Sequence, residues 1–291
     1  MQALAGGVIA DLVIPYSKTE EPDLDRLQSE LKVLQSSGVD GICFGGVLGG
    51  MIGAESSEMS LVCAAVRKSW TKPLFAIVFP DATPEGEDMV RAVDEAGADA
   101  ILVGQPHYLA QPGIDGLEDM FADFRSLTRR PLLVADCLPG SILGVSAIRQ
   151  LAEKRLIDGV LEAADMHVVV DLLCLRMDVP VYSCVEDLHY PALVLGAHGI
   201  ISNLASVFPR QCVDLLNAVR KQDHRSAREI HERLVRLWRA LSSGTEREAR
   251  VRAAMSLRGR PVGAARSPYG RLPQQASQQI KSVLEKEGAL A

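Results

Sequence analysis

Short apolar runs alternate with amphipathic stretches from the N-terminus to about residue 220. This alternation is typical of strand–helix units built around a parallel sheet. The apolar runs predict eight strands, at residues 7–14, 41–44, 74–78, 98–103, 132–135, 159–162, 179–183 and 199–202.

Helix start and stop signals stand between these runs. The stretch 23–36 follows Pro22 and ends before Gly38. Proline near the start and glycine just after the end are typical helix boundaries, so this stretch is predicted to be a helix. The phrase Gly-Val-Asp-Gly at 38–41 returns as Gly-Ala-Asp-Ala at 97–100. In both places glycine can adopt the left-handed conformation that ends a helix, and we expect the next strand to begin at once.

The pattern changes after residue 220. Residues 222–241, 246–257 and 274–287 have helical periodicity with no strands between them, and the segment 258–273 is rich in Gly, Pro and Arg. We therefore expect a barrel domain over residues 1–220 and a C-terminal helical region over 221–291, packed on the barrel and including an ordered loop or linker.

Eight strand–helix units can close into a barrel or stay an open doubly wound sheet. Periodicity alone leaves both open. The number of units favours the barrel, as does the absence of a glycine-rich dinucleotide-binding turn after the first strand, where Ile14-Pro15-Tyr16-Ser17 stands instead. The prediction is an α/β protein, a (β/α)8 TIM barrel with a C-terminal helical extension.

Charge and hydropathy narrow the range of partners. The net charge of -6 argues against a broad nucleic-acid surface, and the basic stretch 247–260 is interpreted as a solvated helix face. No apolar run approaches the roughly 20 residues that cross a bilayer, and the first residues lack a basic signal-peptide region. We expect a cytoplasmic protein without nucleic-acid or membrane partners.

The six cysteines show no CxxC pair and no metal-ligand spacing. Neither a zinc site nor a disulfide framework is indicated, and the pattern fits a reducing compartment.

Five motifs occur in one order at nearly gapless spacing, and together they resemble the dihydrodipicolinate synthase and N-acetylneuraminate lyase superfamily over almost the whole chain. They correspond to that family's T-P-F, G-T-T-G-E, P-Y-Y, G-I-K-E-A/S and G-G-x-G-x-I-S, and Arg266-Ser267-Pro268 corresponds to its R-L-P. In this sequence they read Val13-Ile14-Pro15-Tyr16, Gly46-Val47-Leu48-Gly49-Gly50, Pro106-His107-Tyr108, Gly159-Val160-Leu161-Glu162-Ala163 and Gly196-Ala197-His198-Gly199-Ile200-Ile201-Ser202.

The resemblance implies a lysine at the end of the sixth strand that forms an imine with a 2-oxo acid such as pyruvate. Here that position is Leu161, whose hydrocarbon side chain has no lone pair. The family's proton-relay tyrosine aligns with Ala135, and its two threonines align with Val47 and Leu48. Its turn glutamate aligns with Gly50, and no arginine occurs in residues 137–144, where many members have one for a second carboxylate.

No other lysine is an evident substitute for the missing one. All lysines except Lys18 fall on predicted helices or at their ends, whereas the chemistry of a barrel is located at the C-terminal ends of its strands. Lys18 lies in the first strand–helix loop and is interpreted as a surface lysine.

The predicted barrel mouth keeps an apolar floor and some polar groups, which is the composition of many small-molecule sites. The candidate ligand-binding residues are Val47, Leu48, His107, Tyr108, Ala135, Asp136, Leu161, Ser183, Ile201 and Asn203, with Cys184, Glu186 and Ser202 nearby.

The candidate catalytic residues are Asp136, Glu186 and Tyr108. The two carboxylates can equally cap the helix or loop that follows each of them. His107 replaces a family tyrosine near a subunit contact and is interpreted as packed, whereas Tyr108 matches an aromatic residue that reaches the pocket.

A metal site and a nucleophilic cysteine are less favoured interpretations of these residues than a ligand-binding pocket. Asp136 and Glu186 with His107 could hold a divalent ion, but nothing in their spacing demands it, so no metal and no cofactor are expected. Cys137 and Cys184 are interpreted as small buried residues, because no basic neighbour or helix N-terminus is evident to lower their pKa.

Two functional classes remain open. One is a family member unable to form a Schiff base that binds a small polar metabolite, such as a carboxylate or a sugar-like compound, at the barrel mouth. The other is a lyase of the family with a lysine-independent mechanism. The fold alone does not decide whether the protein is an enzyme, because this barrel hosts many reactions. The resemblance also implies a homo-oligomer, a dimer or a tetramer.

Overall fold

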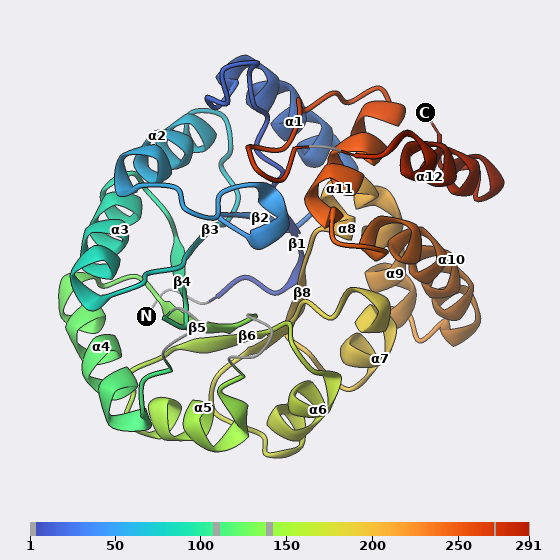
Figure 1. Ribbon diagram of the computed structural model, residues 1–291. Helices are drawn as coiled ribbons and strands as arrows, with labels where there is room; N and C mark the ends of the chain where they lie inside the picture. Colours follow the sequence, from blue (N-terminus) through green and yellow to red (C-terminus); the bar gives the residue numbers. More distant parts are fainter. Residues whose placement is uncertain (1–3, 107–110, 138–141, 271, 291) are drawn as a thin grey trace.

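The computed structural model describes residues 4–106, 111–137, 142–270 and 272–290. Its centre is a closed barrel of eight parallel strands in sequential order, with the last strand paired to the first (Figure 1). This confirms the predicted fold. The strands are β1 (Gly7–Asp11), β2 (Gly41–Phe44), β3 (Leu74–Val78), β4 (Ala100–Gly104), β5 (Leu132–Asp136), β6 (Gly159–Glu162), β7 (Val181–Ser183) and β8 (Gly199–Ser202).

Helices surround the barrel as an outer ring (Figure 1). Two short 3-10 helices, η1 (Val47–Gly49) and η2 (Glu186–Leu188), follow β2 and β7. The helices of the ring are α1 (Leu24–Ser37), α2 (Ser56–Arg67), α3 (Thr83–Glu95), α4 (Ile114–Leu127), α5 (Gly144–Glu153), α6 (Met166–Cys174), α7 (His189–Val194), α8 (Leu204–Val207) and α9 (Pro209–Arg220).

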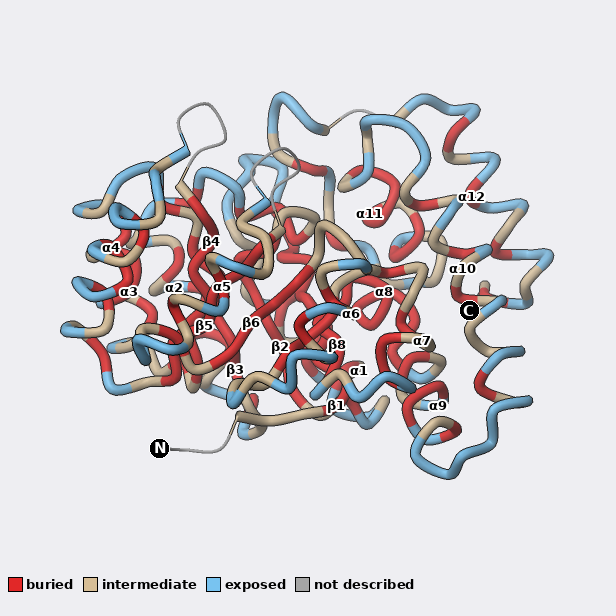
Figure 2. The backbone as a smooth tube through the Cα atoms, turned by 90° about the horizontal axis from the view of Figure 1, so that it is seen from below, coloured by how far each residue is buried: buried red, intermediate tan, exposed pale blue. Residues whose placement is uncertain are grey.

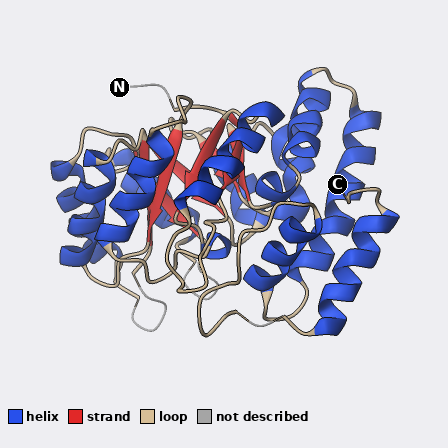
Figure 3. Ribbon diagram, turned by 90° about the horizontal axis from the view of Figure 1, so that it is seen from above, coloured by secondary structure: helices blue, strands red, loops and turns tan. Residues whose placement is uncertain are grey.

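Three C-terminal helices lie on one side of the barrel, two of them outside the ring and the middle one beside α8 (Figures 1 and 3). They are α10 (His224–Ser242), α11 (Arg247–Leu257) and α12 (Gln274–Lys286), close to the three predicted helices. α10 packs against α9, and α11 packs against η1 and α8 beside the barrel mouth. The division of the chain at residue 220 stays a prediction.

Four strands differ from their predicted bounds, among them the one predicted at 132–135, which extends by one residue to Asp136. The first was predicted to reach residue 14 but ends at Asp11, because the chain then turns to bond with the β2 end, with Leu12 N donating to Cys43 O at 2.7 Å. The strand predicted from residue 179 begins at Val181, after Pro180, which has no N–H to donate to a ladder. The strand predicted from residue 98 begins at Ala100.

Alternation along the strands sorts their side chains into two buried clusters. One face of each strand packs against the helices, and the other fills the interior of the barrel, as is usual for this fold. In Figure 2 the strands form the buried centre of the molecule. The interior cluster consists of Ile9, Cys43, Phe75, Ile77, Ala100, Leu102, Leu133, Ala135, Leu161, Tyr182 and Ile201.

The repeated glycine–aspartate phrase has a structural role. Gly38 has φ 83° and ends α1 in the left-handed conformation, as the sequence predicts. The aspartate that follows then ties neighbouring strands together, since Asp40 Oδ2 accepts a hydrogen bond from Val8 N at 2.8 Å. Asp99 Oδ2 likewise accepts from Leu74 N at 2.9 Å.

The basic stretch around α11 is not a solvated face, and that interpretation was wrong. Arg250 and Arg252 are only 7% and 2% exposed. The Arg252 guanidinium donates to Glu248 at 2.8 Å and to the Ile14 carbonyl at 2.9 Å, and it stacks 4.9 Å from the ring centre of Tyr16. A buried arginine is tolerated when its donors are paired in this way, and here it fastens α11 to the β1 end of the barrel.

Within the described part of the chain, no helix combines the length and the apolar character needed to span a bilayer.

Candidate functional site

The floor of the barrel mouth is hydrocarbon. Ala135, Leu161 and Ile201 belong to the interior cluster and are 0%, 2% and 1% exposed. Ala135 and Leu161 face each other in the β5–β6 register. Val47 and Leu48 lie half-buried on η1, directly after β2. The structure thus brings these five predicted ligand-binding residues to the mouth or its edge.

No lysine takes the place of Leu161. All the lysines are described, and all except Lys72 are exposed. Lys72 Nζ donates to the Val39 carbonyl at 2.7 Å, just before β2 begins and therefore at the opposite end of the barrel from the mouth. Lys18 is exposed in the loop after β1, as expected of a surface lysine.

Asp11, which the sequence interpretation missed, brings a carboxyl group to the inside of the mouth. It follows Ile9 by two positions at the end of β1, so that both side chains point to the barrel interior. Asp11 is 4% exposed, and its Oδ2 accepts a hydrogen bond from Asn203 Nδ2 at 2.7 Å. Among the described residues its Oδ1 has no hydrogen-bond partner.

Burial raises the pKa of Asp11 to about 7. The hydrogen bond from Asn203 opposes this effect, and the nearby charge of Glu186 adds to it. Asp11 therefore titrates close to neutral pH, in the range where a carboxyl group can both accept and donate a proton. One signal in the sequence pointed to it, because Asp11 is the single charged residue in the apolar run 7–14.

Three cysteines share the interior with Asp11. Burial raises the pKa of Cys43, Cys137 and Cys184, and the charge of Asp11 raises all three further, which shows that these groups lie in one neighbourhood. Cys137 and Cys184 are half-buried at the edge of the mouth. Their thiols stay protonated at neutral pH, in agreement with the interpretation that they are not nucleophiles.

Asp136 lies on the outer face of the strands and not in the mouth. It is fully buried, and its two oxygens accept from Gln105 Nε2 at 2.7 Å and from Leu143 N at 3.0 Å, just before α5. Its neighbour in the β5–β6 register is Glu162, another fully buried carboxyl. These contacts correspond to the capping interpretation of Asp136.

Burial and the charge of Asp136 act together on Glu162. Glu162 Oε1 accepts from Ala164 N at 2.8 Å and from Asp165 N at 2.9 Å, while among the described residues its Oε2 has no hydrogen-bond partner. Burial, and then the charge of Asp136, raise the pKa of Glu162 to about 8. Both carboxyls accept two other hydrogen bonds, and the pKa of Glu162 is raised above neutral, so we assign a proton at neutral pH to Glu162.

Glu186 also stabilises a turn. It lies on η2, is 5% exposed and accepts hydrogen bonds from Ser202 Oγ at 2.6 Å and from Asn203 N. His189 Nε2 lies 2.9 Å from the same carboxylate and is fully buried. Glu186 therefore holds the turn between β8 and α8, which in turn positions the Asn203 side chain against Asp11.

The turn after β2 is crowded at Gly50. Gly50 has φ 87°, and a Cβ added there would lie 2.7 Å from Glu248 Oε1 and 2.3 Å from the Arg252 guanidinium. The ion pair of α11 thus fills the space that a side chain at position 50 would need.

The remaining predicted residues divide into two groups. Ser183 is fully buried at the end of β7, where its Oγ accepts from Val185 N at 3.3 Å. His107 and Tyr108 lie outside the described residues, so their predicted roles stay predictions. Within the described ranges, no group of three His, Cys, Asp or Glu side chains is arranged to hold a metal ion.

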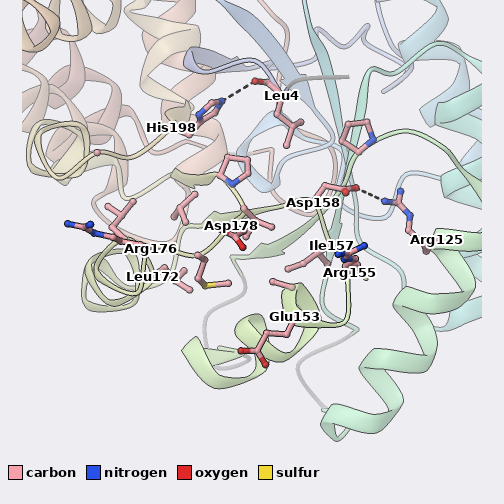
Figure 4. A pocket seen from close by; sticks show the side chains of 18 residues that line it. Leu4, Arg125, Glu153, Arg155, Ile157, Asp158, Leu172, Arg176, Asp178 and His198 are labelled. Atoms are coloured by element: carbon pink, nitrogen blue, oxygen red, sulfur yellow. Dashed lines mark hydrogen bonds and ion pairs between the residues drawn. The ribbon is translucent and has the colours of Figure 1, made fainter. Parts of the chain in front are cut away.

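A groove of about 1470 Å³ opens at the other end of the barrel. It is lined by residues that precede the strands, including Asp158, Pro180 and His198, and Figure 4 shows Asp158 paired with Arg125 and His198 bonded to the Leu4 carbonyl. Because the active sites of such barrels are found where the strands end, we place the candidate site at the mouth around Asp11.

The fold and this site define a (β/α)8-barrel protein whose mouth presents a buried carboxyl and thiols above a hydrocarbon floor. The model of the dihydrodipicolinate synthetase family matches residues 4–287, and the chain belongs to that family.

Curated relatives named 4-hydroxy-tetrahydrodipicolinate synthase are similar over nearly their full length. The one from Methanospirillum hungatei is 29% identical over 290 residues, covering 96% of this chain and 98% of the relative. The one from Methanocaldococcus jannaschii is 26% identical over 289 residues, covering 98% and 99%.

Solved structures of proteins named as members of the same family have the same fold. A dihydrodipicolinate synthase superimposes with a TM-score of 0.90 at 26% identity, covering 98% of this chain and 100% of the other. A prophage protein of the dihydrodipicolinic acid synthase family from E. coli K12, in complex with pyruvate, superimposes with a TM-score of 0.91 at 22% identity, covering 99% and 100%.

Proposed function

We propose that this protein binds a small polar metabolite at the barrel mouth and does not perform Schiff-base chemistry there. The observation that carries the proposal is Leu161, which points into the barrel on β6 opposite Ala135. An imine needs a nucleophilic nitrogen, and a leucine side chain has none. The lysines support the same conclusion, because all are exposed except Lys72, which lies at the opposite end of the barrel.

Reduction with borohydride in the presence of pyruvate tests this proposal directly. Any imine would be converted into a stable secondary amine that mass spectrometry locates on a lysine. We expect no adduct on this protein, whereas a relative named 4-hydroxy-tetrahydrodipicolinate synthase serves as the positive control. A pyruvate adduct on any lysine of this chain would refute the proposal.

Asp11 favours a second candidate function, a lysine-independent lyase in the same barrel. A carboxyl group with a pKa of about 7 is suited to general acid–base catalysis, provided that a substrate proton lies within hydrogen-bond reach. Compounds from a panel of 2-oxo acids, sugars and amino acids that raise the Tm would be assayed for turnover. Turnover lost in the Asp11→Asn variant, with binding retained, would favour the enzyme, and binding without turnover would favour the first proposal.

The proposal places the protein in the cytoplasm as a homo-oligomer. The six cysteines are all free, which supports a reducing compartment. Sedimentation at several protein concentrations would measure the oligomeric state, and a monomer at every concentration would contradict this part of the proposal.

A further inference from the structure

The groove at the end of the barrel opposite the mouth has room for a ligand. Its volume of about 1470 Å³ exceeds the roughly 300 to 1,000 Å³ of most small-molecule sites. A second hollow of about 300 Å³ shares Ala152, Glu153 and residues 176–179 with it and extends it toward Leu175. The two hollows together form an elongated depression that starts below β6 and β7 and continues past the ends of α5 and α6.

Much of the lining of this groove is hydrocarbon that solvent can reach. Half-buried apolar side chains line it, above buried ones that form its floor, and Leu175 at the rim of the smaller hollow is 47% exposed. The half-buried residues are Leu4, Leu173, Met177, Val179 and Pro180, and the buried ones are Pro131, Ile157, Leu172 and Val181. A hydrocarbon chain that covered this accessible apolar surface would be stabilised by its removal from water.

Several polar groups of the groove are already paired within the protein. Asp158 accepts from Arg125 at 2.5 Å, and Glu153 accepts from Arg149 Nε at 2.7 Å. His198 Nε2 lies 3.0 Å from the Leu4 carbonyl oxygen. These groups therefore have little charge left for a ligand.

Three charged side chains of the groove are not paired in this way. Among the described residues, the side chains of Arg155, Arg176 and Asp178 form no hydrogen bond and no ion pair. In Figure 4 the two arginines lie to either side of Asp178. Because two guanidiniums accompany one carboxylate, the unpaired charge of the groove is positive, and a ligand with an anionic group would be attracted to it.

Both unpaired arginines occupy a backbone conformation that favours glycine. Arg155 follows α5 with φ 58°, and Arg176 follows α6 with φ 47°. Other helices of the ring end with a glycine in the same conformation, namely Gly38 after α1, Gly97 after α3 and Gly196 after α7. Strained residues of this kind are concentrated at functional sites, and here the two of them line one groove.

We propose that this groove binds an aliphatic carboxylate. Its hydrocarbon chain would cover Met177, Val179 and Pro180, and its carboxylate would accept hydrogen bonds from the rim that Arg155 and Arg176 form. A guanidinium suits this ligand because its planar fork of donors matches the two oxygens of a carboxylate. The site is distinct from the barrel mouth, so the inference goes beyond the proposed function.

Three probes with one hydrocarbon chain test the sign of the charge. Sodium octanoate, 1-octanol and octylammonium chloride would be titrated by calorimetry at neutral pH and matched ionic strength, below the concentrations at which they form micelles. We expect octanoate to bind at least about tenfold more tightly than octylammonium, since like charges repel in the groove. Equal or tighter binding of octylammonium, or no binding of octanoate, would overturn the inference.

The double variant Arg155→Gly/Arg176→Gly tests the position of the site. It removes both guanidiniums and places glycine where φ is positive. Octanoate binding should weaken at least about tenfold, whereas the Tm should stay equal or rise, because glycine adopts this conformation without steric cost. An octanoate affinity equal to that of the wild type would overturn the inference.

Two matched controls separate the groove from general effects. Gln222→Gly makes the same backbone change after α9, where φ is 58°, outside the groove. Arg228→Gln/Arg239→Gln removes two exposed positive charges on α10. Both should bind octanoate like the wild type, and a comparable loss in either would overturn the inference. None of these outcomes alters the borohydride result at the mouth, so the proposed function is tested separately.

Discussion

Glu162→Gln should stabilise the protein in alkaline solution and leave its stability unchanged in acid. In the wild type, Glu162 Oε1 accepts two backbone N–H groups, Oε2 has no partner among the described residues, and Asp136 is the neighbour in the β5–β6 register. A glutamine amide has the same shape as the protonated acid. Its oxygen can keep both backbone bonds, and its nitrogen can donate permanently to the Asp136 carboxylate.

The magnitude follows from the raised pKa of Glu162. Its pKa rises from 4.5 to about 8 on folding. Such a carboxyl contributes stability that is fully present below pH 4.5 and is lost as the pH rises through about 8, because the unfolded chain ionises more easily than the folded one. At about 1.4 kcal/mol for each pKa unit, the loss between the acid and alkaline limits is at most about 5 kcal/mol.

The assay is thermal unfolding of both proteins between pH 4 and pH 9. For a chain of this size, about 1 kcal/mol corresponds to roughly 1.6 °C in Tm. The Tm of Glu162→Gln should therefore equal that of the wild type near pH 4 and exceed it by up to about 8 °C near pH 9. Glu95→Gln, at an exposed position, controls for the change in net charge. A Tm difference that does not vary with pH would refute the raised pKa of Glu162.

Three further predictions concern packing and reactivity. Gly46→Ala should lower the free energy of unfolding, measured by urea denaturation, by about 2 kcal/mol or more, because its Cβ would meet the Asp11 carboxyl. The loss should be smaller when Asp11 is also replaced by alanine. Arg252→Met should cost about 3 to 5 kcal/mol by the same measurement, since it removes a buried guanidinium and leaves the half-buried carboxylate of Glu248 without its partner. An unchanged midpoint would contradict that role. Maleimide labelling followed by mass spectrometry should modify Cys174 first, because it is the exposed cysteine, and faster labelling at any other cysteine would show that the mouth or core opens in solution.

Much of the candidate site could be located from the sequence because parallel strands end at one face of a barrel. That rule, applied to the apolar runs, located Ala135, Leu161 and Ile201 in the barrel interior and Val47 and Leu48 in the turn directly after β2. The same rule failed for Asp136 and Ser183. Successive residues of a strand point alternately into the barrel and toward the helices. Only the closed barrel decides which of two neighbouring residues at a strand end points inward.

The sequence by itself determined the order and approximate bounds of the eight strands, the glycine that ends α1, and the absence of an amine at position 161, because these depend on local periodicity and residue type. Tertiary structure decided that Asp11 lies in the mouth, that Glu162 meets Asp136, and that the arginines of α11 are buried. Each of these depends on contacts between distant segments, and contacts of that kind set the desolvation and the charge that a side chain experiences.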